Sequence, residues 1–145
     1  MDANFGAVYS PYVTVFKSGR DNNYDTLDEP FVTAVISAAA IKNPPLKDGK
    51  LADWVKKTIK NKIRQILSVA LENGHDSIVL GAFGCGAYKT PATEMARLFR
   101  EILLSKDYNG KFDKIVFAIL EDNNSFHEYN PQGNLKPFLD EFSKN

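Results

Sequence analysis

A run of small residues between a short apolar segment and an amphipathic one most constrains how this chain folds. Ser77-Ile78-Val79-Leu80 has the composition of a short buried strand, and Thr90-Pro91 is typical of the N-cap and first position of a helix. The residues between them are Gly81, Ala82, Phe83, Gly84, Cys85, Gly86, Ala87 and Tyr88. A strand that turns into a helix through glycines indicates an α/β domain, in which ligands bind beyond the carboxyl ends of the strands.

The segments on either side of this turn alternate between strand and helix patterns. Apolar residues recur at helical spacing from about Leu51 to Glu72, whereas Lys114–Leu120 and Leu135–Phe142 predict a buried strand and a short closing helix. Two earlier apolar segments, Tyr12–Phe16 and Phe31–Ile36, predict strands, and the second should be covered on both faces. We therefore expect a largely parallel sheet with helices on both faces.

Composition limits the function classes. With 145 residues the chain can bury a core as a single domain over residues 1–145. A formal net charge of zero gives no general attraction to nucleic acid or an anionic membrane, and no run approaches the roughly 18 apolar residues that span a bilayer. One cysteine and two histidines cannot form an internal disulfide or a multi-cysteine metal site. We expect no cofactor. We also expect the protein to be located in a reducing compartment, the cytoplasm, with the nucleus as the alternative.

The glycine-rich turn is suited to binding an anion. Gly81, Gly84 and Gly86 allow positive φ and let main-chain N–H groups approach a ligand closely. The helix that begins near Pro91 adds the positive end of its dipole. These features predict a phosphate or diphosphate site; the alternative is a tight connection that binds nothing. The turn lacks the signatures of a P-loop and of a dinucleotide-binding fold, which argues against a kinase or a dehydrogenase.

Three side chains near the turn raise further hypotheses. Cys85 could be a nucleophile for transfer or hydrolysis of a phosphorylated small molecule, but no histidine is close in sequence, which favours an inert, semi-buried thiol. Tyr88 should lie at the mouth of the site, where its ring could stack on a sugar or a base. Phe126 follows the last predicted strand, so it should reach the same edge and could hold a nucleobase.

The segment His75–Tyr88 closely resembles the diphosphate loop of the microbial-type poly(ADP-ribose) glycohydrolases, a branch of the macrodomains. Three further pieces are similar in the same order, namely Tyr9-Ser10-Pro11, Glu29–Ala40 and Val116–Ile119. The resemblance thus runs from about Val8 to Phe142. It implies a three-layer α/β/α fold around a mixed sheet, and binding of ADP-ribose or of an ADP-ribosylated protein.

The resemblance also implies roles for residues at matching positions. The main-chain N–H groups of Gly84–Ala87 would hold the diphosphate, within a ligand-binding loop that extends over Gly81–Tyr88. Tyr88 would lie against the distal ribose, and Phe126 is a weaker candidate for the adenine side, because its loop matches the family poorly.

One departure from the family concerns catalysis. Its hydrolytic members carry a Gly-Gly-Gly loop and a Gln-Glu-Glu motif upstream of the Tyr-Ser-Pro segment, and this chain contains neither. Glycoside cleavage needs a proton donor at the leaving oxygen. We therefore expect a domain truncated at its amino end relative to the family, which binds ADP-ribose and is weak or inactive as a hydrolase by itself.

Two other readings stay open. The chain could be an active hydrolase whose acid is Asp28, Glu29 or a residue of another chain, or it could have a purely structural role. Strand edges left exposed by a truncation predict a homodimer or a partner chain that covers them.

Overall fold

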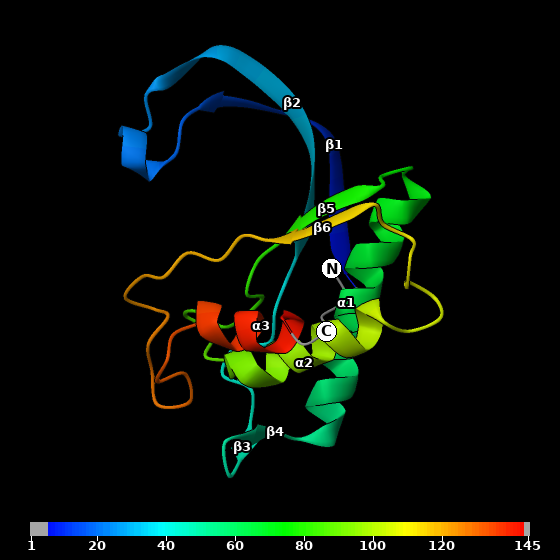
Figure 1. Cartoon of the computed structure of the whole chain (residues 1–145), viewed down its shortest axis with the longest axis vertical. Coiled ribbons are helices and arrows are strands. Elements are labelled where there is room, and N and C mark those ends of the chain that lie inside the picture. The colour runs from blue at the N-terminus through cyan, green and yellow to red at the C-terminus, as the bar shows by residue number, and fades with distance from the viewer. Residues whose placement is uncertain (1–5, 144–145) are drawn as a thin grey trace.

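The structure is a computed structural model that describes residues 6–143, so residues 1–5 and 144–145 of the predicted domain lie outside the described residues. Helices and strands alternate through the second half of the chain (Figure 1). The elements in chain order are β1 (Ala7–Lys17), η1 (Arg20–Asn22), β2 (Thr26–Ala38), β3 (Leu46–Lys47), β4 (Lys50–Leu51), α1 (Asp53–Glu72), β5 (Ser77–Leu80), α2 (Ala92–Leu103), β6 (Lys114–Phe117) and α3 (Leu135–Phe142). The predicted mixed α/β fold class is confirmed.

The two long strands β1 and β2 form an antiparallel hairpin that stands away from the rest of the chain, with η1 at its tip (Figure 1). We call this hairpin the arm. Ala7 pairs with Ala38 at its base, and two register shifts interrupt the ladder and bend it. Both early predicted strands lie within the arm, but the second is not covered on both faces. Phe31 and Val32 are exposed, because the arm extends beyond the helices.

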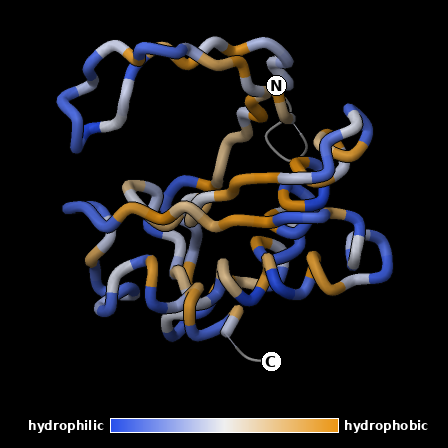
Figure 2. Tube along the Cα trace, turned by 45° about the horizontal axis from the view of Figure 1, so that its top comes forward, coloured by the Kyte–Doolittle hydropathy of each residue, from blue (hydrophilic) through white to orange (hydrophobic). Residues whose placement is uncertain are grey.

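The strands β5 and β6 pair in parallel, with Ser77 opposite Lys114 and Leu80 opposite Phe117. β6 ends at Phe117, earlier than the predicted Leu120, since the chain leaves the ladder after the Ala118 N–H donates to the Leu80 carbonyl at 2.8 Å. The three helices lie on one side of this pair (Figure 2). Within residues 6–143 the strands form three separate two-stranded sheets, so the largely parallel sheet with helices on both faces is not found.

The core lies between these helices. α1 begins at Asp53 and buries a stripe at helical spacing, and α2 and α3 bury a second apolar surface against it. The fully buried members include Val55, Ile59, Ile63, Leu67, Met95, Phe99 and Ile102. Burying one such side chain stabilises a fold by roughly 1.5–3 kcal/mol. α1 ends at Glu72 with Asn73 as its C-cap, and Gly74 follows with a φ of +77°, a left-handed conformation typical of glycine after a helix.

Candidate functional site

The predicted ligand-binding loop, Gly81–Tyr88, leaves the carboxyl end of β5 and leads into α2. Gly84 has a φ of +75°, and a Cβ built on it would lie 2.9 Å from the Cβ of Ala40. No other residue type fits this position without strain. The Gly84 carbonyl accepts a hydrogen bond from the Thr90 N–H at 3.0 Å, which closes the loop onto the start of α2.

The main-chain N–H groups of this loop fall into two sets. One set donates within the loop, from Phe83, Cys85, Lys89 and Thr90. The other set makes no hydrogen bond to any residue in the range 6–143, and it comprises Ala82, Gly84, Gly86, Ala87 and Tyr88. The Cys85 amide, which the resemblance assigned to the diphosphate, is therefore engaged, because it donates to the Ala82 carbonyl at 3.0 Å in a tight turn. The amides of Gly84, Gly86 and Ala87 are available to a ligand.

Two pockets meet at Gly86 and Ala87. The β6 pocket, of 240 Å³, is completed by the segment after β6 and has among its lining residues Ala82, Ala118, Leu120, Asp122 and Asn124. The β2 pocket, of 340 Å³, is completed by the segment after β2 and is lined by Ala38, Ala39, Ala40, Phe83, Gly84 and Tyr88 as well. A ligand lying across Gly86 would therefore occupy both pockets and meet unpaired amides where they join.

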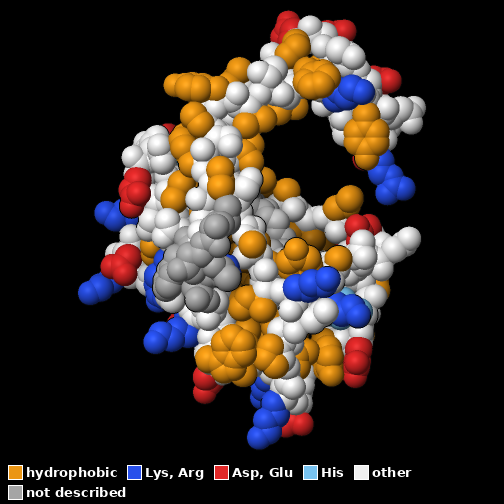
Figure 3. All heavy atoms as spheres, turned by 180° about the vertical axis from the view of Figure 1, so that it is seen from behind, with side chains coloured by type: hydrophobic (Ala, Val, Ile, Leu, Met, Phe, Trp, Pro, Cys, Tyr) orange, Lys and Arg blue, Asp and Glu red, His pale blue; other side chains and the backbone are white. Residues whose placement is uncertain are grey.

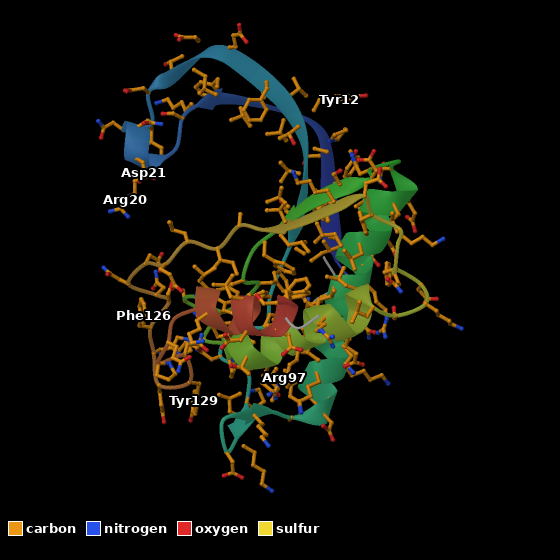
Figure 4. All side chains as sticks on the ribbon, in the orientation of Figure 1. Tyr12, Arg20, Asp21, Arg97, Phe126 and Tyr129 are labelled. Atoms are coloured by element: carbon orange, nitrogen blue, oxygen red, sulfur yellow. The ribbon has the colours of Figure 1, made fainter. Side chains whose placement is uncertain are left out.

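The predicted aromatic residues have different positions. Tyr88 lines the β2 pocket, and its carbonyl accepts a hydrogen bond from the Asn43 N–H at 2.9 Å, which anchors this end of the loop. Phe126 is exposed on the loop after β6 (Figure 4) and is not among the lining residues of either pocket. Its neighbour His127 contacts the glycine-rich loop instead, with Nε2 3.2 Å from the Cys85 carbonyl oxygen. Gly81 lines a separate groove between β2 and β5.

The Cys85 side chain does not have the properties of a nucleophile. It is fully buried, and burial raises the pKa of the thiol to about 12. Its Sγ lies 3.6 Å from the Phe83 carbonyl oxygen, which accepts its weak hydrogen bond. Because the thiolate is the reactive form, this environment supports the inert thiol and disfavours covalent chemistry at Cys85.

The two acids suggested for an active hydrolase, Asp28 and Glu29, lie on the arm. Both are exposed on β2, toward the end of that strand nearest η1. Neither lines the β2 pocket or the β6 pocket. The fold therefore gives no support to either side chain as the proton donor for a ligand on the glycine-rich loop.

Asn130 is a residue of the site that sequence reasoning missed. Its side chain is buried, and Oδ1 accepts a hydrogen bond from the Ala92 N–H at 2.7 Å, at the start of α2. Its Nδ2 donates to Asn134 Oδ1 at 2.8 Å and to the Cys85 carbonyl at 3.4 Å. This single amide thus joins the loop to the starts of α2 and α3. The N-cap of α2 is Pro91 and not the predicted Thr90, it makes no side-chain capping bond, and the Asn130 side chain accepts from the first N–H of the helix instead.

The arm also reaches the site, which no local pattern indicates. Arg20, in η1 at its tip, shares a 340 Å³ hollow with residues of the segment after β6, including Asp122 and Asn124 of the β6 pocket. Figure 4 shows Arg20 and Asp21 at this tip, on the same side of the molecule as Phe126. Arg20 therefore lines a hollow that shares Asp122 and Asn124 with the β6 pocket.

Metal-ligand clusters and helices able to cross a membrane are both absent from residues 6–143. In that range no group of three or more histidine, cysteine, aspartate or glutamate side chains is arranged to hold a metal ion. No helix there combines the length and apolar character that a bilayer crossing requires.

No protein-family model and no curated protein sequence matches the chain. Solved structures do match it. A poly(ADP-ribose) glycohydrolase from Deinococcus radiodurans in complex with ADP-ribose superposes with a TM-score of 0.76 at 29% identity, over 94% of this chain and 52% of that chain. The glycohydrolase from Thermomonospora curvata gives a TM-score of 0.76 at 25% identity, over 94% of this chain and 47% of that chain.

The fold and the glycine-rich loop together define an α/β domain whose loop leaves the carboxyl end of a parallel strand and leads into a helix. More particularly, the chain is similar to the microbial-type poly(ADP-ribose) glycohydrolases, and the resemblance predicted from the sequence is confirmed. The chain spans about half the length of these relatives.

Proposed function

We propose that this chain is an ADP-ribose-binding domain related to the macrodomains, which takes free ADP-ribose or ADP-ribose attached to a protein. The observation that carries the proposal is the set of unpaired amides at Gly84, Gly86 and Ala87, where the β2 and β6 pockets meet. Each hydrogen bond from such an amide to a charged phosphate oxygen stabilises a complex by about 1.5–3 kcal/mol. The positive end of the α2 dipole adds to this attraction.

The two pockets fit the two halves of such a ligand. The diphosphate lies across Gly86, and the distal ribose enters the β2 pocket against the Tyr88 ring. The adenosine half enters the β6 pocket, where Asp122 and Asn124 present polar groups, and Phe126 directly follows Ser125, another lining residue of this pocket. Support for ADP-ribose as the ligand comes from the similar Deinococcus radiodurans glycohydrolase, whose structure is a complex with ADP-ribose.

We also propose that the chain by itself is weak or inactive as a hydrolase. Among the described residues that line the β2 pocket, where the distal ribose would lie, none carries a carboxyl group. Asp122 lines the β6 pocket, but it is committed to a turn, since its Oδ1 accepts a hydrogen bond from the Asn124 N–H at 2.8 Å. Without a positioned proton donor, glycoside cleavage loses about two to four orders of magnitude in rate. The alternative is an active hydrolase whose acid another chain supplies.

Calorimetry with ADP-ribose tests the binding proposal, with Gly86→Ala as the informative variant. A Cβ on Gly86 would meet only the Asn124 Cβ at 3.7 Å, an ordinary contact, so the variant should fold normally. The added methyl group would nevertheless stand where the two pockets join. We expect the wild-type chain to bind and Gly86→Ala to weaken binding by about 10-fold or more, which corresponds to about 1.4 kcal/mol.

Gly19→Ala is the matched control, because a Cβ there has nothing within 4 Å and lies on the arm. It should leave both the melting temperature and the affinity unchanged. Absence of heat at millimolar ADP-ribose, or equal affinity of Gly86→Ala and the wild type, would contradict the proposal. Release of ADP-ribose from a modified protein by the chain alone would contradict the claim of weak hydrolysis.

A further inference from the structure

A main-chain group fixes the orientation of two side-chain amides beside the β6 pocket. The Ala92 N–H can only donate, so the Asn130 atom 2.7 Å from it must be the carbonyl oxygen Oδ1. The nitrogen of the same amide, Asn130 Nδ2, donates to Asn134 Oδ1 at 2.8 Å. Because the oxygen of Asn134 faces Asn130, the Nδ2 group of Asn134 must point elsewhere. The bond from Ala92 thus sets the orientation of both amides in turn.

The Nδ2 group of Asn134 is a donor without a partner among residues 6–143. Asn134 bonds there through Oδ1 and through its main-chain N–H, which donates to Glu121 Oε2 at 3.2 Å. The residue is only 4% exposed. Its Nδ2 nevertheless reaches open space, because Glu94 Oε2 is the one enclosed side-chain oxygen or nitrogen without a hydrogen-bond partner in the described range. Asn134 lines the β6 pocket, so this donor is available to a ligand there.

The Asn134 side chain is not needed to cap α3. Asn134 is the N-cap of that helix, but it makes no side-chain capping bond. The carboxylate of Glu121 takes this role, since its Oε1 accepts from the Leu135 N–H at 2.6 Å. A buried amide whose donor has neither a capping role nor a partner within the described residues is available for recognition of a ligand.

The same pocket also presents an acceptor. Asp122 lines it, and its Oδ1 accepts hydrogen bonds from the Asn124 N–H at 2.8 Å and from the Ser125 hydroxyl at 3.4 Å. These bonds hold the carboxyl group in place, and within residues 6–143 they leave Oδ2 without a hydrogen bond. An ionised carboxylate accepts hydrogen bonds and donates none. The pocket therefore combines an oriented donor on Asn134 with an oriented acceptor on Asp122.

A nucleotide has room to reach this pocket. Figure 3 shows, from behind, that the arm stands off from the body of the molecule and leaves an opening between them. The segment after β6 lies opposite the tip of the arm, since Arg20 shares a hollow with Glu121–Asn124. The opening gives a base a route to this segment.

A donor and an acceptor in one pocket match one edge of adenine. Adenine presents N1, which accepts a hydrogen bond, beside the 6-amino group, which donates one. The 6-oxo purines reverse both groups, since N1 carries a hydrogen and the oxygen at position 6 accepts. In the β6 pocket such a base would oppose donor to donor at Asn134 and acceptor to acceptor at Asp122. Polar groups left unpaired in this way make a site reject the wrong ligand strongly.

We propose that Asn134 determines the base specificity of the site: its Nδ2 donates to N1 of adenine, while Asp122 accepts from the 6-amino group. This inference rests on the proposed function, which brings the adenosine half into the β6 pocket. It adds that the pocket selects adenine over a 6-oxo purine. Asn130 acts through Asn134 as a positioning residue, because it holds the Oδ1 end of that amide.

Calorimetry with ADP-ribose and with inosine diphosphate ribose, its 6-oxo counterpart, tests the inference. The wild-type chain should bind ADP-ribose more tightly by about 10-fold or more, because two hydrogen bonds become two repulsive contacts. Asn134→Asp replaces the donor by an acceptor of the same size, so the ratio of the two affinities should fall by about 10-fold. Repulsion between the added charge and the diphosphate acts on both ligands equally and cancels in this ratio.

Asn123→Asp is the matched control. Asn123 is exposed in the same segment as Asp122, and it lines the hollow beside Arg20 but not the β6 pocket. This variant adds the same charge and should keep the wild-type ratio. Asn134→Ala is a second variant, in case the aspartate prevents folding. It should weaken ADP-ribose binding by about 10-fold and leave the affinity for inosine diphosphate ribose nearly unchanged.

The results separate this inference from the proposed function. Equal affinity of the wild-type chain for the two ligands would overturn the role of Asn134 and leave ADP-ribose binding intact. An affinity ratio that stays at the wild-type value in the Asn134 variants would do the same, because a purely structural role would weaken both ligands alike. Absence of heat with either ligand would remove the proposed function, and this inference with it.

Discussion

Replacement of Gly84 by alanine should both destabilise the domain and close the proposed phosphate site. The residue has a φ of +75°, and a Cβ there would lie 2.9 Å from the Ala40 Cβ and 3.1 Å from Thr90 Oγ1. A left-handed alanine costs about 1–2 kcal/mol relative to glycine. The steric conflict costs about 1–3 kcal/mol more, since Ala40 and the buried Thr90 have no flexible side chain to move aside. We expect a total loss of about 2–5 kcal/mol of unfolding free energy.

Gly74→Ala supplies the matched control. Gly74 has nearly the same backbone conformation, with a φ of +77°, but a Cβ there has nothing within 4 Å. This variant should lose only the backbone part of the cost, about 1–2 kcal/mol, and should keep its ADP-ribose affinity. The difference in unfolding free energy between the two variants, measured by urea titration, therefore isolates the contact with Ala40 and Thr90.

Calorimetry adds a second readout for Gly84→Ala. To relieve the conflict the loop must move away from Ala40, which lines the β2 pocket, so affinity for ADP-ribose should fall by about 10-fold or more. If Gly84→Ala and Gly74→Ala were equally stable and bound ADP-ribose equally well, the reasoning from this close approach would be refuted.

Two further predictions concern buried groups. Asn130→Ala leaves the Ala92 N–H without a side-chain partner and removes one of the two side-chain contacts to the Cys85 carbonyl, the other being from His127. The variant should lose about 1–3 kcal/mol of unfolding free energy in urea titration and bind ADP-ribose more weakly. An unchanged affinity would show that Asn130 does not position the loop. Burial raises the pKa of the Cys85 thiol from 9.0 to about 12. The thiol of the unfolded chain therefore loses its proton at a lower pH than the thiol of the folded chain. As a result, the free energy of unfolding should fall by about 1.4 kcal/mol per pH unit above pH 9. Cys85→Ala should remove that slope, and an identical pH dependence in the two proteins would contradict the burial argument.

The features predicted correctly from the sequence are those that local pattern determines. The short strand before the glycines and the closing helix were predicted with the bounds that the structure gives, Ser77–Leu80 and Leu135–Phe142. Their boundaries follow from neighbouring residues, such as the polar segment before Leu135. The unpaired amides at Gly86 and Ala87 also follow from local glycine content, whereas the engaged Cys85 amide depends on a turn geometry that composition does not specify.

The features that sequence reasoning missed depend on contacts between distant segments. Phe31 and Val32 have the composition of a buried strand, yet they are exposed on an arm whose position no local pattern reveals. Asn130 lies in a polar segment typical of an irregular loop, and only the folded chain places it between Cys85 and Ala92. Arg20 reaches the edge of the site from the tip of the arm for the same reason.

Binding and cleavage of ADP-ribose make different physical demands on a protein. Main-chain amides can hold a diphosphate, and their positions depend on the conformation of the loop. In the proposed site, the affinity for the diphosphate therefore depends on the conformation of the segment between Gly81 and Tyr88. Cleavage needs a carboxylic acid at one oxygen of the distal ribose, a side-chain property that conformation alone does not provide. The β2 pocket is lined within the described residues by alanines, glycines and two aromatic rings, so the lining carries no acidic group that could protonate a sugar there.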